Sequence, residues 1–210
     1  DRGVIWTASD DGLPTGAYVA KLAVCGGSIF AGTWRPPNVT ISHDEGVFRS
    51  KDGGLSWAST NDGLPVDRQV SAFAYGGAWT YVSLAQGMYR SEDDGDSWTA
   101  CDQGLPAHQR VDTIISNGSV LLAGVGNVGV HRSYDRGESW ALIPGSPIFT
   151  RRFVAAGTAL YAACWEGRGV SRSSDDGNTW QHDTRGLTHR FIRDLVEHQG
   201  VLYAASSEGG

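Results

Sequence analysis

The 210-residue sequence predicts an all-β fold of repeated four-stranded antiparallel sheets, and three observations support this prediction. An eight-residue motif, S-x-D-x-G-x-[ST]-W, occurs four times, at residues 50–57, 91–98, 133–140 and 173–180. Its tryptophans follow one another at spacings of 41, 42 and 40 residues, the length of one four-stranded blade of a β-propeller. The 29 glycines suit the many short turns of such a fold.

Each copy of the motif is expected to form the turn between the third and fourth strands of a blade. An Asp in a turn accepts hydrogen bonds from N–H groups that follow it, and a Gly two residues later permits a positive φ. The Trp then buries a large ring surface. We therefore expect structural rather than catalytic roles, since a catalytic residue is not needed once per repeat. The expected structural residues are Asp1, Asp52, Asp93, Asp135 and Asp175 with Trp6, Trp57, Trp98, Trp140 and Trp180.

The motif is similar to the Asp-box, also called the BNR repeat. The chain therefore resembles the Asp-box β-propellers, which include sialidases, xyloglucanase-type glycoside hydrolases, sortilin-like receptors and photosystem II assembly factor-like bacterial proteins. Four copies in register cover nearly the whole chain, and residues 1–6 hold part of a fifth copy. The resemblance implies the propeller fold. It does not select a function, because one architecture hosts many functions.

The repeats predict a single β-propeller domain over residues 1–210, with about five blades of ~42 residues. The fifth blade contains only two predicted strands, at residues 191–197 and 202–206. Two arrangements remain open. A strand from residues 1–9 completes the last blade and closes a five-bladed ring, or the chain is a fragment of a larger propeller. Closure is favoured because it removes exposed sheet edges.

Charge and hydropathy argue against two classes of partner. The formal net charge is −6 and no basic stripe is present, so a nucleic-acid partner is not expected. No apolar run approaches the roughly 20 residues of a membrane span. Two glycosylation sequons, at Asn38 and Asn117, are weak evidence for secretion in a eukaryote, and a secreted or periplasmic location is favoured. The oligomeric state stays open.

The three cysteines, Cys25, Cys101 and Cys164, occupy positions where the other repeats place small or apolar residues. We expect buried free thiols, with one disulfide plus a leftover thiol as the alternative. No Cys and His residues have the spacing of metal ligands, so neither a metal site nor a cofactor is expected.

Loops that do not repeat are the best candidates for a binding site. The fourth-to-first and second-to-third connections should share one face of the propeller, here called the loop face, opposite the motif turns. Trp stacks on sugars or apolar groups, and Arg or Glu form hydrogen bonds beside it. The alternative is that these loops only pack over the central funnel. The expected ligand-binding residues are Trp34, Arg35, Trp165, Glu166, Arg168, Arg110, Arg152 and Arg190.

The first strand of each blade should line the central channel. Two successive positions of these strands are occupied by Ala20, Ser71, Asp112, Arg151 and Arg193, and then by Lys21, Ala72, Thr113, Arg152 and Asp194. We expect ion pairs among the arginines and aspartates of this set. They either fill a narrow channel or form a pocket for an anionic group.

The favoured function is a non-catalytic scaffold that binds a protein or glycan partner through the loop face. A structural or assembly role differs from it only in the partner. The alternative is a glycoside hydrolase of sialidase or xyloglucanase type, which needs two carboxylates, or a Tyr nucleophile with a Glu. The candidate acids are Glu166, Asp112 and Glu208. The sialidase resemblance also implies an Arg-Ile-Pro segment, to which Arg35-Pro36-Pro37 is only distantly similar.

Overall fold

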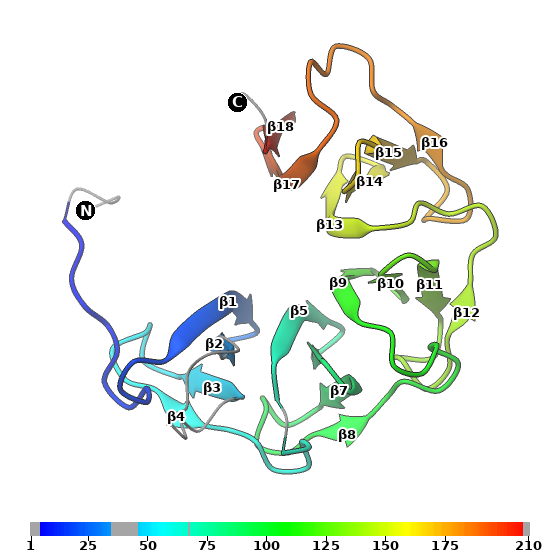
Figure 1. Ribbon diagram of the computed structural model, residues 1–210. Coiled ribbons are helices and arrows are strands. Elements are labelled where there is room, and N and C mark those ends of the chain that lie inside the picture. The colour runs from blue at the N-terminus through cyan, green and yellow to red at the C-terminus, as the bar shows by residue number, and fades with distance from the viewer. Residues whose placement is uncertain (1–4, 35–45, 67, 208–210) are drawn as a thin grey trace.

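The structure is a computed structural model that describes residues 5–34, 46–66 and 68–207. Every helix or strand assigned in these ranges is a β-strand. The strands form four four-stranded antiparallel sheets and one two-stranded sheet, arranged as blades around a common centre (Figure 1). The predicted β-propeller fold is confirmed.

Each complete blade is a meander in which every strand pairs with its neighbour in sequence. The first strands, nearest the centre, are β1 (Tyr18–Cys25), β5 (Val70–Gly76), β9 (Val111–Asn117), β13 (Thr150–Ala156) and β17 (Ile192–His198). The second strands are β2 (Ser28–Trp34), β6 (Trp79–Leu84), β10 (Val120–Val125), β14 (Ala159–Cys164) and β18 (Val201–Ser206). The third strands are β3 (Val47–Ser50), β7 (Gly87–Ser91), β11 (Gly129–Ser133) and β15 (Gly169–Ser173). The fourth strands are β4 (Ala58–Ser59), β8 (Thr99–Ala100), β12 (Ala141–Leu142) and β16 (Gln181–His182).

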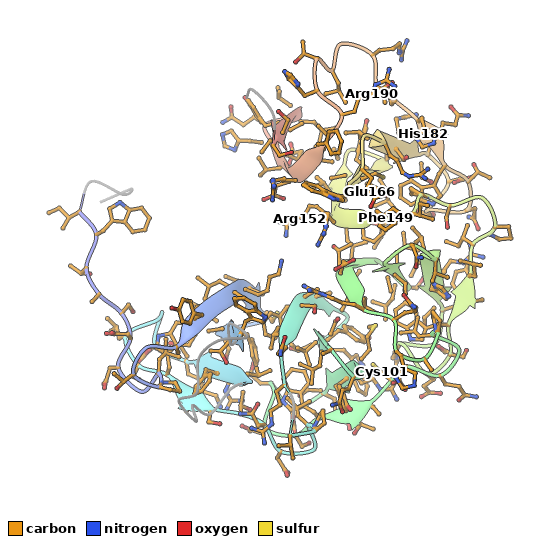
Figure 2. All side chains as sticks on the ribbon, in the orientation of Figure 1. Cys101, Phe149, Arg152, Glu166, His182 and Arg190 are labelled. Atoms are coloured by element: carbon orange, nitrogen blue, oxygen red, sulfur yellow. The ribbon has the colours of Figure 1, made fainter. Side chains whose placement is uncertain are left out.

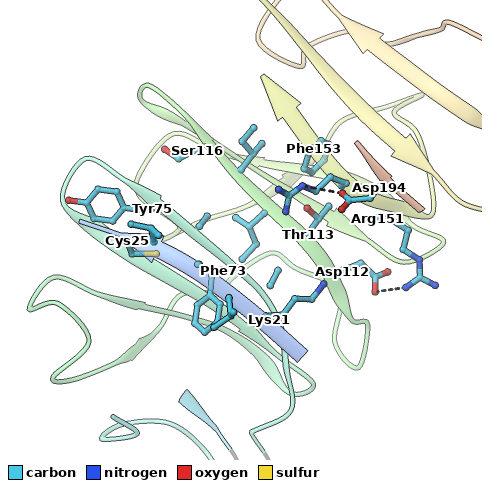
Figure 3. A pocket seen from close by; sticks show the side chains of 18 of the residues that line it. Lys21, Cys25, Phe73, Tyr75, Asp112, Thr113, Ser116, Arg151, Phe153 and Asp194 are labelled. Carbon is cyan, nitrogen blue, oxygen red and sulfur yellow. Dashed lines mark ion pairs between the residues drawn. The ribbon is translucent and has the colours of Figure 1, made fainter. Parts of the chain in front are cut away.

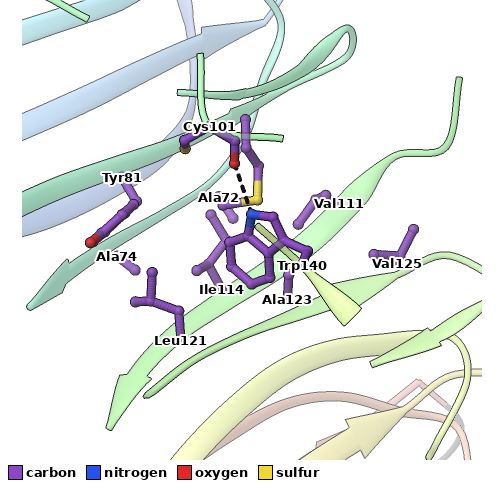
Figure 4. Packing of buried hydrophobic residues seen from close by; sticks show 11 residues of the cluster. Ala72, Ala74, Tyr81, Cys101, Val111, Ile114, Leu121, Ala123, Val125 and Trp140 are labelled. Carbon is purple, nitrogen blue, oxygen red and sulfur yellow. Dashed lines mark hydrogen bonds between the residues drawn. The ribbon is translucent and has the colours of Figure 1, made fainter. Parts of the chain in front are cut away.

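The hydrophobic core lies between neighbouring blades (Figure 4). Tyr81 and Met88 of the second blade pack with Leu121 and Trp140 of the third. The Trp140 indole N–H donates to the carbonyl oxygen of Cys101, 2.8 Å away in the preceding blade. Neighbouring blades therefore stabilise each other, as expected when a single repeat is too small to bury its own apolar faces.

The motif turns are held by the bonds that the sequence predicts. In the third blade, the Ser133 hydroxyl donates to Asp135 Oδ1 at 2.7 Å and accepts the Gly137 N–H at 2.8 Å. Asp135 also accepts the Ser139 N–H at 2.9 Å. Hydrogen bonds from the Ser139 hydroxyl and N–H lower the pKa of Asp135 to about 2. The same bonds recur in the other three motif turns, so the Asp carboxylate of each turn is hydrogen-bonded to the local backbone.

Arginines of the third strands connect each of the first three blades to the motif turn of the next. Arg90 donates to the Arg136 carbonyl oxygen at 2.8 Å and to Glu138 at 3.1 Å. Arg49 contacts Asp96 in the same way at 2.5 Å. These repeat arginines are therefore structural and do not face the channel.

All three cysteines are free and buried, which confirms the prediction. Burial raises the pKa of the Cys25 and Cys101 thiols to about 12, so both stay protonated at neutral pH. Within the described ranges, no His, Cys, Asp and Glu side chains form a group of three or more that could hold a metal ion. The same ranges contain no helix with the length and apolarity needed to cross a membrane.

The two ends of the described chain do not meet (Figure 1). Residues 5–9 form no strand, and within the described part of the chain β18 pairs only with β17. Trp6 is 89% exposed, whereas the other four motif tryptophans are buried or half-buried. The packing of Trp6 in a fifth motif and the single domain over residues 1–210 stay predictions. Asp1 lies outside the described residues.

Candidate functional site

The first strands of the five sheets surround a central cavity of about 640 Å³ (Figure 3). One part of its wall is apolar and includes Phe73 and Phe153. The other part is charged, and Figure 3 shows Lys21 on β1 pointing toward Asp112 and the ion pairs of β9, β13 and β17. The predicted channel is thus a cavity with separate apolar and charged regions.

A β-bulge at the same position of every first strand places the charged side chains. The strand pairing skips one residue in each case, and these residues are Ala20, Ser71, Asp112, Arg151 and Arg193. A bulge leaves its extra residue out of the ladder and changes the direction of its side chain. Asp112, Arg151 and Arg193 consequently meet at one end of the cavity.

These three residues belong to a smaller pocket of about 260 Å³, here called the arginine pocket. Its lining residues are Lys21, Arg110, Asp112, Arg151, Trp165 and Arg193. Arg110 precedes β9 on a fourth-to-first connection, and Trp165 lies on the turn between β14 and β15. The turn between β1 and β2 lies on the opposite face, where the Ser28 hydroxyl donates to Asp94 of a motif turn at 2.7 Å. The pocket therefore opens on the loop face.

The arginine pocket has an excess of positive charge. Asp112 Oδ1 lies 3.2 Å from Arg110 Nε and 3.6 Å from a terminal nitrogen of Arg151, so one carboxylate is shared by two guanidinium groups. Beside the pocket, Arg152 Nε lies 3.5 Å from Asp194 Oδ1. Arg193 and Lys21 add two further cations. Burial, followed by the charges of Arg110 and Arg152, lowers the pKa of Lys21, and the two aspartates oppose this shift.

Trp165 lines the pocket, and neighbouring side chains pack against its ring. The Arg193 guanidinium lies over its indole ring, 4.6 Å from the ring centroid, and the Arg151 guanidinium lies at 5.7 Å. Phe191 packs edge-on at 5.8 Å between ring centroids. The backbone N–H of Trp165 donates to the Phe149 carbonyl oxygen at 2.9 Å, which anchors the turn. A guanidinium group that stacks its flat face on an aromatic ring keeps the N–H donors at its edge available to bind an anion.

The structure brings together only part of the predicted site. Arg110, Trp165 and Asp112 line the arginine pocket, and Arg152 lines the adjoining central cavity. The predicted ion pairs of Arg151 with Asp112 and of Arg152 with Asp194 are present. Arg193 instead stacks on Trp165.

The remaining predicted residues lie elsewhere. Glu166 and Arg168 are exposed on the turn that carries Trp165, and neither lines the cavity or the pocket. Arg190 is exposed on the connection between β16 and β17, away from the centre toward which Arg152 points (Figure 2). Trp34, at the end of β2, is 39% exposed and lines neither space. Arg35, Asn38 and Glu208 lie outside the described residues.

Besides Asp112, which is a candidate acid, three residues of the pocket are absent from the predicted ligand-binding set: Lys21, Arg151 and Arg193. The sequence places all three in the channel, with Arg151 and Arg193 at equivalent positions of the first strands and Lys21 one position later. The sequence predicts that Arg151 and Arg193 approach the channel aspartates, but it does not reveal the bulge that turns both arginines toward Trp165.

No protein-family model and no curated protein matches this sequence. Solved structures match it by fold. YCF48 bound to D1 peptide superposes with a TM-score of 0.67 and 18% identity, covering 94% of this chain and 65% of that one. The GH74 xyloglucanase of Xanthomonas campestris superposes with a TM-score of 0.68 and 17% identity, covering 89% of this chain and 33% of that one. An ancestral GH74 enzyme superposes with a TM-score of 0.62 and 20% identity, covering 93% of this chain and 27% of that one. The chain thus spans less than two thirds of each of these proteins, and the likeness shows the propeller fold alone.

Proposed function

We propose that this chain is a non-catalytic binding module that holds an acidic segment of a protein partner in the arginine pocket. One observation carries the proposal: four cationic side chains surround a pocket that contains a single carboxylate, and that carboxylate is already shared by two arginines. A pocket with this charge balance attracts carboxylate groups, and guanidinium groups bind them with two parallel hydrogen bonds.

The aromatic wall favours a protein partner over a glycan. A sugar ring stacks on an open aromatic face, but Arg193 covers a face of Trp165 and Phe191 packs against its ring. The cations are distributed over β1, β13, β17 and the connection before β9, so an extended acidic peptide can contact several at once. The propeller neighbour YCF48 is bound to a peptide, which is compatible with this use of the fold.

The glycoside hydrolase alternative has less support. It requires two carboxylates free to act as acid and base or nucleophile. Asp112 and Asp194 both face arginines within 3.6 Å, and Glu166 lines neither the cavity nor the pocket. Release of reducing sugar from xyloglucan, lost in Asp112→Asn, would restore this alternative.

The proposal is tested by fluorescence anisotropy with a labelled Glu-rich peptide. We expect the double variant Arg151→Gln with Arg193→Gln to bind roughly tenfold or more weakly, since losing a charged partner costs well over 1.4 kcal/mol. Arg185→Gln is the control, because Arg185 lies outside the pocket and its side chain is 93% exposed.

A Gln-rich peptide of the same length shows whether binding depends on charge. The proposal fails if the Gln-rich peptide binds as tightly as the Glu-rich one. It also fails if Arg185→Gln weakens binding as much as the double variant does.

A further inference from the structure

The chain contains only two lysines, and they lie in contrasting environments. Lys51 belongs to the first motif turn, where its ammonium group lies 3.9 Å from Asp94 Oδ2 and its side chain is 60% exposed. Lys21 lies on β1 and lines both the central cavity and the arginine pocket. The two amines sit on opposite faces of the propeller, so each is an internal control for the other.

Burial and two neighbouring arginines lower the pKa of Lys21, which increases the fraction of its amine that is neutral. Arg110 and Arg152 repel its positive charge, while Asp112 and Asp194 attract it. Each of these carboxylates already faces an arginine, at 3.2 Å and 3.5 Å. A lysine amine in such surroundings is a better nucleophile than an exposed one, because only the neutral amine attacks a carbonyl carbon.

The same pocket attracts small anions that carry a reactive carbonyl group. Arg151 and Arg193 provide guanidinium groups on the side of the pocket formed by β13 and β17, and both lie over the ring of Trp165. A cleft lined by one sign of charge raises the local concentration of ions of opposite sign. The anion and the amine would therefore be held in one space of about 260 Å³.

We propose that Lys21 is a covalent modification site for small aldehydes that carry a phosphate or carboxylate group. The neutral Nζ attacks the aldehyde carbon, a C–N bond forms, and the proton lost from nitrogen moves to the carbonyl oxygen. Loss of water then gives an imine. The arginines hold the anionic group during attack. The inference uses the pocket of the proposed function but needs no protein partner.

The test uses pyridoxal 5′-phosphate as the phosphate-bearing probe and glyoxylate as the carboxylate-bearing one. Borohydride reduces the imine to a stable secondary amine, and peptide mapping by mass spectrometry separates Lys21, Lys51 and the α-amino group. We expect Lys21 to be labelled roughly tenfold or more faster than Lys51, the lower end of the enrichment that a charged cleft provides. Labelling by only one probe would assign the site to that anion.

Pyridoxal, which lacks the phosphate, is the matched neutral probe. Its preference for Lys21 should be much smaller, and the double variant Arg151→Gln with Arg193→Gln should slow labelling by pyridoxal 5′-phosphate but not by pyridoxal. Lys21→Arg should remove the fast labelling, and Lys51→Gln should leave it unchanged. Thermal melting of each variant verifies that it is folded.

Equal labelling of the two lysines, or equal rates with and without the phosphate, would overturn the inference. The outcomes also separate it from the proposed function. If Lys21 is labelled preferentially but no acidic peptide binds, only the proposed function fails. If the peptide binds but Lys21 shows no preference, only the modification site fails.

Discussion

Arg193 on β17 lies over the indole ring of Trp165 on the β14–β15 turn, with its guanidinium carbon 4.6 Å from the ring centroid. The contact joins the two-stranded sheet to the neighbouring blade and places a cation at the mouth of the arginine pocket. Because the ring carries no net charge, its contribution to anion binding would be positional: it holds the guanidinium in place. This distinction leads to a test in which no charge is removed.

Trp165→Ala is expected to weaken binding of the acidic peptide by roughly 2- to 30-fold, the range that corresponds to a cation–π contact of about 0.5–2 kcal/mol. Fluorescence anisotropy measures the affinity, and Trp34→Ala is the control because Trp34 lines neither the cavity nor the pocket. Equal weakening by both substitutions would argue against the positional role of Trp165.

Gly104→Ala should destabilise the protein far more than Gly186→Ala. Both glycines have positive φ, +91° and +80°, in equivalent turns before a first strand. A Cβ at Gly104 would lie 2.2 Å from the Trp140 carbonyl oxygen, whereas nothing lies within 4 Å of a Cβ at Gly186. We expect Gly186→Ala to lower the free energy of unfolding by about 1 kcal/mol through backbone strain, and Gly104→Ala to lower it by several times that amount. Urea denaturation measures both, and equal losses would contradict the predicted clash.

Ser133→Ala should lower the free energy of unfolding by about 1–3 kcal/mol, because it leaves the Gly137 N–H without its acceptor. Ser133 is 1% exposed, so water cannot easily replace the hydroxyl. Ser139→Ala is the comparison. Because Ser139 is exposed, this variant should lose less free energy of unfolding than Ser133→Ala does. A larger loss in Ser139→Ala, measured by thermal or urea denaturation, would show that the buried hydroxyl is not the main support of this turn.

Asp135→Asn should change how stability depends on pH. Hydrogen bonds from Ser139 lower the pKa of Asp135 from 3.8 to about 2 in the folded protein. Because the folded value lies below the unfolded one, the ionised carboxylate stabilises the fold above the unfolded pKa. This contribution is lost as the pH falls through about 4 to about 2.

Asn has no carboxyl group to titrate, so the stability difference between wild type and Asp135→Asn should be largest at neutral pH. It should shrink within that acidic window. Urea denaturation at a series of pH values measures the difference, and a constant difference throughout would contradict the shifted pKa. Comparing the two proteins at each pH removes the effect of the other motif aspartates, which titrate in both.

The repeated fold and the motif turns follow from the amino-acid sequence alone. The bonds of Asp135 to Ser133 and Ser139 join residues only two and four positions apart, so the motif largely specifies them. The period of about 41 residues then predicts the blades, and the order of strands within a blade places the first strand beside the channel.

The exact contacts among the channel residues depend on how the strands pair and the blades pack. The bulges at Asp112, Arg151 and Arg193 arise from strand pairing, and one residue of register changes the direction of a side chain. The stacking of Arg193 on Trp165 joins two sheets, and no local pattern encodes the distance between them. Local hydrogen bonds follow from short spacing along the chain, whereas contacts across the centre depend on how whole blades pack.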